Sequence, residues 1–535
     1  MTRTKCRKYI FGAIAALLIV SCGKPPTGEQ TRGSISVSEL VRTGAIEELQ
    51  VALAENQVSC VEIVSAYLAR IEAFDKSKGL NAITVVNPEA LADAAAMDAR
   101  YASGETIGSL FCAPILVKDN IDTAGLATTG GSLAFSDIPP RTNAPIMQRL
   151  LEADAILIAK TNMAEWAFSP RQSISATYGR TINAYDTGLT PAGSSGGTAS
   201  GVAAGFGVAG LGTDTGNSVR GPSSHLALTG LRPTLGLVSR TGIVPLAFDR
   251  DTAGPMAQSA RDAALLMDVL AGVDPEDSYT DRADQIATGT FQAAIESASL
   301  SGVKIGVLRA LADPESTDPE ILESFETAIS DLGEAGADIV DPFVIPNLDT
   351  HLDNGSMFCP RFRYDVAQYA QRRGEALDTN EVLASGAYGT DDPRVKGGLE
   401  YFSQYPIDVH PKDWETPCPD LLDHPGRMAY RGDVIAALDD GEIDLFIYPS
   451  WTSKPAAIDR ANEDYRGDNS QLVAPATGLP AATTPMGFTN DGAPLGLQIS
   501  GRPYSDPFIL GVAAAYEAAT QHRRLPDGYP ALSDE

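Results

Sequence analysis

Two serines in glycine-rich segments and one upstream lysine are the residues of this chain best suited to nucleophilic chemistry. Ser194 lies within Gly193–Gly197, and Ser218 lies within Gly212–Arg220. Glycine-dense backbone can adopt positive φ, and it can bring N–H groups close to a reacting atom. Lys118 has no flanking basic residue, which makes it a candidate base for a serine. These residues predict a serine nucleophile that a lysine activates.

Ser195 offers a competing nucleophile. The segment Gly193–Gly197 also fits Gly-x-Ser-x-Gly, the nucleophile elbow of α/β-hydrolase esterases, with Ser195 at its centre. That elbow needs a strand running directly into it. The preceding residues, Asp186–Ala192, contain Gly, Thr and Pro and are typical of a loop. The elbow is therefore kept as the less favoured alternative.

The motifs continue over most of the chain, and together they resemble those of the amidase signature family. Pro114–Ser132 resembles the lysine segment of that family, Pro191–Gly236 its signature core, and Thr477–Ala481 one of its closing segments. The resemblance runs roughly from Val37 to Leu525. It implies a hydrolase of carbon–nitrogen bonds in linear amides, which forms an acyl-enzyme and releases a carboxylic acid plus ammonia or an amine.

The resemblance assigns a role to each of the three reactive residues. It makes Ser218 the nucleophile, Ser194 the bridging serine and Lys118 the base. In the family, a cis peptide bond precedes the bridging serine, which here is the bond Gly193–Ser194. Loss of any of these three residues would have favoured a catalytically silent binding protein on the same fold, and all three are present.

The turn before Ser218 is expected to bind the oxyanion. The resemblance implies donation by backbone N–H groups of Thr215, Gly216 and Asn217. Asn217 stands where many members have glycine, and asparagine tolerates positive φ better than most residues. The flanking Asp214 and Arg220 have two open interpretations: they order this turn by hydrogen bonds and charge, or they form a purely structural ion pair.

Short apolar segments alternate with helical patterns after the first hundred residues. This alternation predicts an α/β fold in which a largely buried sheet is covered by helices. The resemblance implies a single large domain with a twisted mixed β-sheet core. The expected helices are Ala45–Phe74 (one or two helices), Pro88–Tyr101, Ala144–Ala153, Thr198–Phe206, Pro319–Glu334 and Pro507–Gln521. The expected strands are Ile115–Lys118, Ala155–Ala159, Val208–Gly212, Val303–Leu308, Asp338–Val340 and Asp444–Tyr448.

The first residues predict an export signal. Basic residues precede the apolar run Ile10–Val20, which is too short to span a bilayer. The sequence Ile19–Gly23 resembles a bacterial lipoprotein cleavage site with Cys22 as the acylated residue. We expect a signal peptide over 1–21, a lipid-anchored flexible tether over 22–36, an amidase domain over 37–527 and a tail over 528–535. The protein is then a membrane-anchored, periplasmic lipoprotein, with plain secretion as the alternative.

Composition limits the partners. The formal net charge is −29, so a phosphate backbone is repelled and nucleic acid is not an expected partner. A role in tRNA amidation, an alternative within the family, is disfavoured because an exported protein would not meet tRNA. The five histidines show no metal-ligand spacing. We expect no metal and no cofactor, a small-molecule or peptide amide as substrate, and an undetermined oligomeric state.

Two regions carry further expectations. Cys359 and Cys418 are the expected disulfide pair, whereas Cys60 and Cys112 are expected to be buried free thiols. The stretch 343–440 shows little periodicity and is expected to form irregular, substrate-facing loops that set substrate choice. The run Arg220–His225 looks most like the peptide-amidase-like branch of the family.

Overall fold

A large mixed β-sheet forms the centre of the molecule. The computed structural model describes residues 36–135, 139–354 and 357–533, and within them one sheet has eleven strands in the order β1-β3-β2-β6-β8-β7-β12-β13-β11-β9-β10. Parallel and antiparallel pairs both occur: β2 is parallel to β3 and β6, whereas β12 is antiparallel to β7 and β13. The predicted fold class is therefore confirmed.

The strands are β1 (Ile83–Val86), β2 (Pro114–Lys118), β3 (Ile156–Thr161), β4 (Ser173–Ser175), β5 (Gly179–Thr181), β6 (Ala209–Asp214), β7 (Thr229–Arg232), β8 (Thr252–Ala257), β9 (Lys304–Val307), β10 (Asp338–Val340), β11 (Leu445–Pro449), β12 (Ala481–Phe488) and β13 (Pro494–Gly501). The pair β4 and β5 forms a separate small sheet.

The helices are α1 (Val37–Thr43), α2 (Ile46–Ala54), α3 (Cys60–Phe74), α4 (Ala90–Ser103), α5 (Pro145–Glu152), α6 (Gly196–Ala203), α7 (Arg220–His225), α8 (Ala260–Leu270), α9 (Thr290–Glu296), α10 (Pro319–Glu334), α11 (Leu348–Asp353), α12 (Phe362–Arg372), α13 (Thr379–Ser385), α14 (Pro393–Phe402), α15 (Pro425–Asp440), α16 (Ala474–Thr477) and α17 (Asp506–Thr520). In the described part of the chain, none of them combines the length and apolarity that crossing a bilayer demands.

Parallel pairing of β2 with β6 determines where the reactive residues meet. All five residues of β2 and all six of β6 are buried, as expected for strands covered on both faces. Their register pairs Ile115 with Ala209 and Val117 with Leu211. Both strands therefore end at the same edge of the sheet, which brings Lys118 close to Thr213 at the end of β6.

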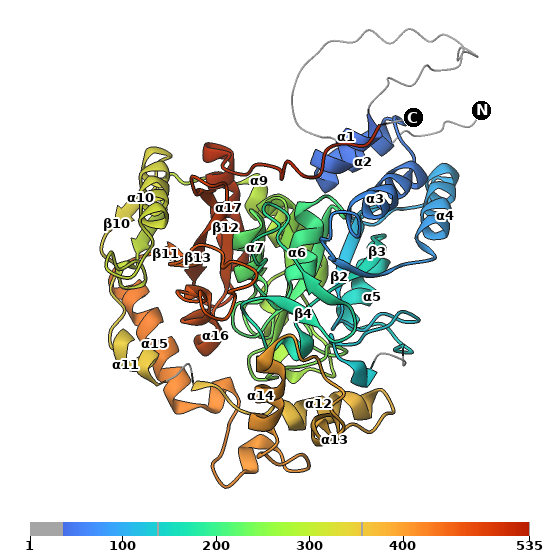
Figure 1. Ribbon diagram of the computed structural model, residues 1–535. Coiled ribbons are helices and arrows are strands. Elements are labelled where there is room, and N and C mark those ends of the chain that lie inside the picture. Colours follow the sequence, from blue (N-terminus) through green and yellow to red (C-terminus); the bar gives the residue numbers. More distant parts are fainter. Residues whose placement is uncertain (1–35, 136–138, 355–356, 534–535) are drawn as a thin grey trace, which may run out of the picture. The chain divides into compact units, whose positions relative to one another are not determined.

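The helix α6 packs against both of these strands (Figure 1). Every one of its residues is buried, and most have small side chains. A Cβ atom on Gly197 would lie 2.2 Å from the carbonyl oxygen of Asn162, so only glycine fits there. The small side chains thus let the segment before α6, which contains Ser194, approach the sheet edge closely. The helix expected over Thr198–Phe206 is present, although it begins at Gly196 and ends at Ala203.

The expectation of irregular loops over 343–440 is wrong, because this stretch contains the helices α11 to α15. Figure 1 shows α12, α13 and α14 grouped together at the lower side of the molecule. Their apolar faces pack into a cluster with Phe135, Trp166 and Phe168, which lie earlier in the chain, between β2 and β4. This cluster joins the helical stretch to the segments around the reactive residues.

The cysteine predictions are half right. Cys359 and Cys418 form a disulfide, as expected. Cys60 and Cys112 also form one, with Cα atoms 5.7 Å apart, so the expectation of free thiols is wrong. Cys60 is the first residue of α3, and Cys112 lies in the turn before β2. Their pairing follows from the packing of these two elements, which the local sequence does not encode.

Candidate active site

Lys118 is fully buried at the carboxyl end of β2. Its Nζ donates hydrogen bonds to Ser194 Oγ at 2.7 Å and to Thr213 Oγ1 at 2.8 Å. Burial lowers the pKa of Lys118 to about 7, although the carboxylates of Asp214 and Asp251 act in the opposite direction. A lysine with this pKa is neutral in a large share of molecules at neutral pH, and so it can accept a proton.

Ser194 follows a cis peptide bond, Gly193–Ser194, as the sequence resemblance implied. Its hydroxyl accepts from Lys118, and its carbonyl oxygen accepts from the N–H of Ala164 at 3.1 Å. The side chain is fully buried. Ser194 therefore lies in direct contact with the lysine.

Ser218 lies in the turn that leads from β6 into α7, and it lines a cavity. Its Oγ donates to the side-chain oxygen of Asn217 at 3.3 Å. Within the described residues, no hydrogen bond joins Ser218 Oγ to Ser194 Oγ. Serine has three staggered side-chain rotamers, so a proton relay requires the Ser218 hydroxyl to leave Asn217 and turn to Ser194.

The turn before Ser218 supplies backbone donors to the same cavity. The N–H groups of Gly216, Asn217 and Ser218 have no hydrogen-bond acceptor among the described residues. Thr215, Gly216 and Asn217 all line the cavity together with Ser218. Unpaired N–H groups beside a nucleophile are the donors that a developing oxyanion needs.

A buried ion-pair network holds this turn. Asp214 contacts Arg220 at 3.0 Å and Arg232 at 2.9 Å, and all three side chains are fully buried. Burial acts to raise the pKa of Asp214, but the two guanidinium groups outweigh it and lower the pKa to about 2. Asp214 also accepts from the N–H of Val219 at 3.2 Å, and Arg220 donates to the carbonyl of Gly216 at 2.7 Å. The ion pair thus orders the turn, which unites the two interpretations of these residues.

Thr213 is a site residue that sequence reasoning missed. Its hydroxyl accepts from both Lys118 Nζ and Asn120 Nδ2, the latter at 3.0 Å. Asn120 thereby helps to orient the lysine. The one available signal was that Thr213 directly follows the expected strand Val208–Gly212, but the register of this strand against that of Lys118 was needed to use it.

Ser195 takes a different position from the one that the elbow alternative requires. No strand leads into it, and it is the residue that precedes the first turn of α6. Its hydroxyl exchanges hydrogen bonds of 3.3 Å with the backbone N–H and carbonyl of Thr213. Ser195 is fully buried and is absent from the described lining of the cavity that contains Ser218.

The cavity beside Ser218 has a volume of about 500 Å³, which is within the usual range for small-molecule sites. Aromatic rings and two arginines dominate the rest of its wall: Phe168, Phe358, Tyr401, Phe402, Arg250 and Arg394. Most of these residues come from the helical stretch 343–440. Among the described residues there is no cluster of His, Cys, Asp and Glu side chains that could hold a metal ion.

Sequence comparison gives one family over most of the chain. The model of the family described as Amidase matches residues 62–510. Curated relatives include a glutamyl-tRNA(Gln) amidotransferase subunit of Synechococcus sp. (strain CC9311), 33% identical over 90% of this chain and 99% of the relative. The protein of the same name from Chloroflexus aggregans is 34% identical over 89% of this chain and 96% of the relative.

Structural comparison agrees with the family match. The native peptide amidase from Stenotrophomonas maltophilia superposes with a TM-score of 0.79 and 31% identity, covering 90% of this chain and 98% of that one. An amidase family protein from Bacillus anthracis has the same TM-score of 0.79 with 26% identity, over 93% of this chain and 96% of that one. The chain therefore belongs to the amidase signature family and is an amidase, an enzyme that hydrolyses the carbon–nitrogen bond of amides.

Proposed function

We propose that Ser218 is the nucleophile of this amidase, and that Ser194 and Lys118 relay its proton. The observation that carries the proposal is the 2.7 Å hydrogen bond between Nζ of the buried Lys118 and Ser194 Oγ. Neutral Lys118 takes the proton of Ser194, and Ser194 takes the proton of Ser218. The Ser218 oxygen then attacks the amide carbonyl carbon.

The same relay, run backwards, completes the first half of the reaction. The tetrahedral intermediate collapses, the carbon–nitrogen bond breaks, and the departing amine receives the proton that Lys118 held. Backbone N–H groups of the turn Thr215–Ser218 stabilise the oxyanion, and those of Gly216, Asn217 and Ser218 have no acceptor among the described residues. Water, deprotonated through the same two groups, then attacks the ester formed with Ser218 and releases the carboxylic acid.

We infer that the substrate is a peptide or small-molecule amide and not an aminoacylated tRNA. The relatives named for glutamyl-tRNA(Gln) amidotransferase cover nearly the whole chain, so the sequence match alone would allow a tRNA-linked role. The net charge of −29 argues against it, because such a surface repels phosphate. The likeness to a peptide amidase supports a free amide instead.

We further propose that the protein is an exported lipoprotein, anchored to the membrane through an acylated Cys22. Residues 1–35, which include the signal sequence and Cys22, lie outside the described residues. Independent support comes from the two disulfides, Cys60–Cys112 and Cys359–Cys418. Disulfides form and persist in oxidising compartments such as the periplasm, and they are rare in the bacterial cytosol.

The experiment that tests the catalytic proposal is replacement of Ser218 by alanine in the soluble domain. Turnover of a panel of peptide and aryl amides should fall on the order of 10⁴- to 10⁶-fold, as for loss of a serine nucleophile elsewhere. Ser195→Ala is the matched control, because it removes a hydroxyl one residue from Ser194 but away from the cavity. Loss of turnover in Ser195→Ala, with Ser218→Ala active and both variants folded, would contradict the proposal.

A further inference from the structure

The helix α14 presents one of its faces to the cavity that contains Ser218. The residues on this face recur at spacings of three and four, as one face of a helix requires: Arg394, Gly397, Gly398, Tyr401 and Phe402. A Cβ atom on Gly397 would meet nothing within 4 Å. Glycine inside a helix costs about 1 kcal/mol relative to alanine, and here it leaves open space next to Arg394.

Among the described residues, no carboxylate forms an ion pair with the guanidinium of Arg394. Its Nη1 is inaccessible to solvent and has no hydrogen-bond acceptor, and no carboxylate lies within 4.0 Å among the described residues. The oxygens of the adjacent Asp392 are engaged elsewhere, by the backbone N–H of Arg394 at 3.0 Å and by Gln172 Nε2 at 3.1 Å. Arg394 as a whole is half-buried, but a buried guanidinium nitrogen is normally paired, so Nη1 is free to donate to an anion in the cavity.

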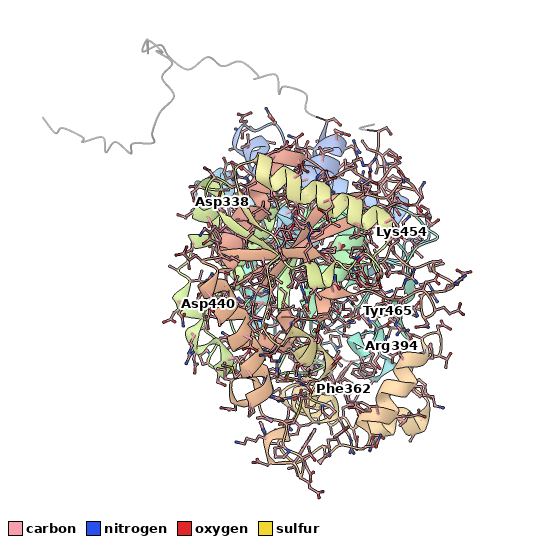
Figure 2. The ribbon with its side chains drawn as sticks, turned by 90° about the vertical axis from the view of Figure 1, so that its left-hand side faces the viewer. Asp338, Phe362, Arg394, Asp440, Lys454 and Tyr465 are labelled. Carbon is pink, nitrogen blue, oxygen red and sulfur yellow. A yellow bond between two sulfur atoms is a disulfide. The ribbon has the colours of Figure 1, made fainter. Side chains whose placement is uncertain are left out.

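A second guanidinium reinforces the positive charge. Arg171 stacks on the ring of Tyr465 at 4.5 Å, and its buried Nε has no acceptor among the described residues. Figure 2 shows Arg394 next to Tyr465. Burial lowers the pKa of Arg394, and the charge of Arg171 acts in the same direction. The hydroxyl of Tyr465 and Nε2 of Gln471 donate to Oδ2 of Asp468, at 2.6 and 2.7 Å, and no ion pair within 4.0 Å joins Asp468 to Arg394 among the described residues.

The charge of the cavity wall is opposite to that of the whole chain. The formal net charge of the protein is −29, yet the described wall of the cavity contains Arg250 and Arg394 and no Asp or Glu. In such a cavity, an anion gains from the arginines, and no wall carboxylate repels it. Aromatic rings occupy the wall beside Arg394, so the part of the ligand next to the anion is apolar.

We propose that the amide substrate of this enzyme carries a carboxylate, separated from the scissile amide by an apolar segment, and that Arg394 binds this carboxylate. This proposal rests on the proposed function of Ser218 and adds the substrate class to it. Arginine suits the role because its planar fork can donate two parallel hydrogen bonds to a carboxylate. Arg394 is a specificity residue in this account and takes no part in proton transfer.

The test compares two pairs of probes that differ in one carboxylate. In the first pair, the carboxylate is on the acyl side: the para-nitroanilide of glutaric acid, with its other carboxylate free, against that of pentanoic acid. In the second pair, it is on the amine side: N-benzoylglycine against N-benzoylpropylamine. The wild-type enzyme should favour the carboxylate-bearing member of one pair, which identifies the side that faces Arg394.

The variant Arg394→Gln should lower that preference, measured as the ratio of kcat/KM within the pair. The expected fall is about 10- to 100-fold, the usual size of a charge-assisted hydrogen bond. It should reside mainly in KM, because Arg394 binds the substrate and does not act on the reacting bond. Arg394→Lys keeps the charge without the planar fork, and should lower the ratio only part of the way.

Lys396→Gln is the matched control. It removes a positive charge from the same helix at an exposed position, where Lys396 pairs with Glu400 at 3.5 Å. The ratio of kcat/KM within the probe pair should be the same in Lys396→Gln as in the wild type. Equal falls in Lys396→Gln and Arg394→Gln, or an unchanged ratio in a folded Arg394→Gln, would overturn the proposal. If Arg394→Gln does not fold, the Arg394→Lys ratio decides in the same way.

The rates of the wild-type enzyme on the four probes distinguish a failure of this proposal from a failure of the proposed function. Hydrolysis of the neutral probes with no preference in either pair would overturn the role of Arg394 and leave the proposed function in place. No hydrolysis of any of the four probes would overturn the proposed function, and with it the substrate class inferred here.

Discussion

Lys118 is the residue whose environment differs most from what its type alone would suggest. An exposed lysine is protonated at neutral pH and cannot act as a base. Here burial lowers the pKa of Lys118 to about 7, and its Nζ has two hydroxyl partners in Ser194 and Thr213. Hydroxyl oxygens can accept from either protonation state of the lysine, so neither state is left without a partner.

The pH dependence of kcat/KM of the wild-type enzyme should reveal the titration of Lys118. Because the active form is deprotonated Lys118, kcat/KM for an amide should rise as pH increases through about 7 and then level off. Lys118→Ala should remove this step and lower amide hydrolysis by about 10²–10⁴-fold. Rates of a para-nitroanilide measured over a pH series check both statements.

An activated ester is the control substrate for the same variant. A phenoxide leaves without protonation, whereas an amine does not, so Lys118→Ala should harm amide hydrolysis more than hydrolysis of a para-nitrophenyl ester. Equal losses on both substrates would show that Lys118 is a structural cation and not a proton shuttle.

For single residues, the sequence indicated which side chains are candidates for catalysis but not which hydrogen bonds they form. The motifs alone led to the hypothesis that Lys118, Ser194 and Ser218 act together, and the structure places Lys118 and Ser194 in hydrogen-bond contact. The hydrogen bond of Lys118 to Thr213 depends on the register of β2 against β6, which no local pattern specifies. The contact of Ser218 with Asn217 depends on a side-chain rotamer, which the sequence does not specify either.

At the scale of elements, the helical stretch 343–440 shows where periodicity fails. Several of its helices are short, with seven residues in α13 and ten in α14, so a hydrophobic repeat has little room to appear. Capping was the better signal. Asp378 and Asp392 each accept from a backbone N–H two residues ahead, and Gly386 ends α13 with positive φ. These start and stop residues are visible in the sequence.

The disulfide Cys359–Cys418 ties this helical stretch together beside the cavity, because the neighbouring Phe358 lines the wall. The double variant Cys359→Ser/Cys418→Ser should lose about 2–5 kcal/mol of stability. It should also raise KM for amides more than it lowers kcat, since Phe358 is then held less firmly. Urea unfolding and steady-state kinetics measure the two effects.

Removal of the second disulfide, Cys60–Cys112, is the control for removal of Cys359–Cys418. Cys60→Ser/Cys112→Ser removes a bridge between α3 and the start of β2, at the opposite end of that strand from Lys118. This variant should lose stability by a similar amount with KM unchanged. A KM increase of the same size in both double variants would mean that the bridges act only through global stability.

At the scale of the whole molecule, the alternation of helices and strands was enough to predict the fold class but not the strand order. The strands β12 and β13, at 481–501, insert between β7 at 229–232 and β11 at 445–449. This pairing joins segments that lie hundreds of residues apart in the chain. Packing of the complete sheet decides it, and local propensity carries no information about it.

The proposed attachment to the membrane concerns the whole chain and depends on one residue, Cys22. Cys22→Ser should release the protein from the membrane fraction into the soluble periplasmic or extracellular fraction, because a tether with no acyl chain has no other proposed anchor. Fractionation of cells expressing the full chain, with the Cys60→Ser/Cys112→Ser variant as a cysteine control, measures it. Retention of Cys22→Ser in the membrane would show that the lipoprotein proposal is wrong.

The central claim is that the covalent intermediate forms on Ser218. Labelling of the wild-type enzyme with a fluorophosphonate, followed by peptide mapping by mass spectrometry, tests it most directly, because the reagent bonds to the activated serine alone. We expect one adduct, on Ser218, and no adduct in Ser218→Ala. An adduct on Ser195, or labelling that persists in Ser218→Ala, would contradict it.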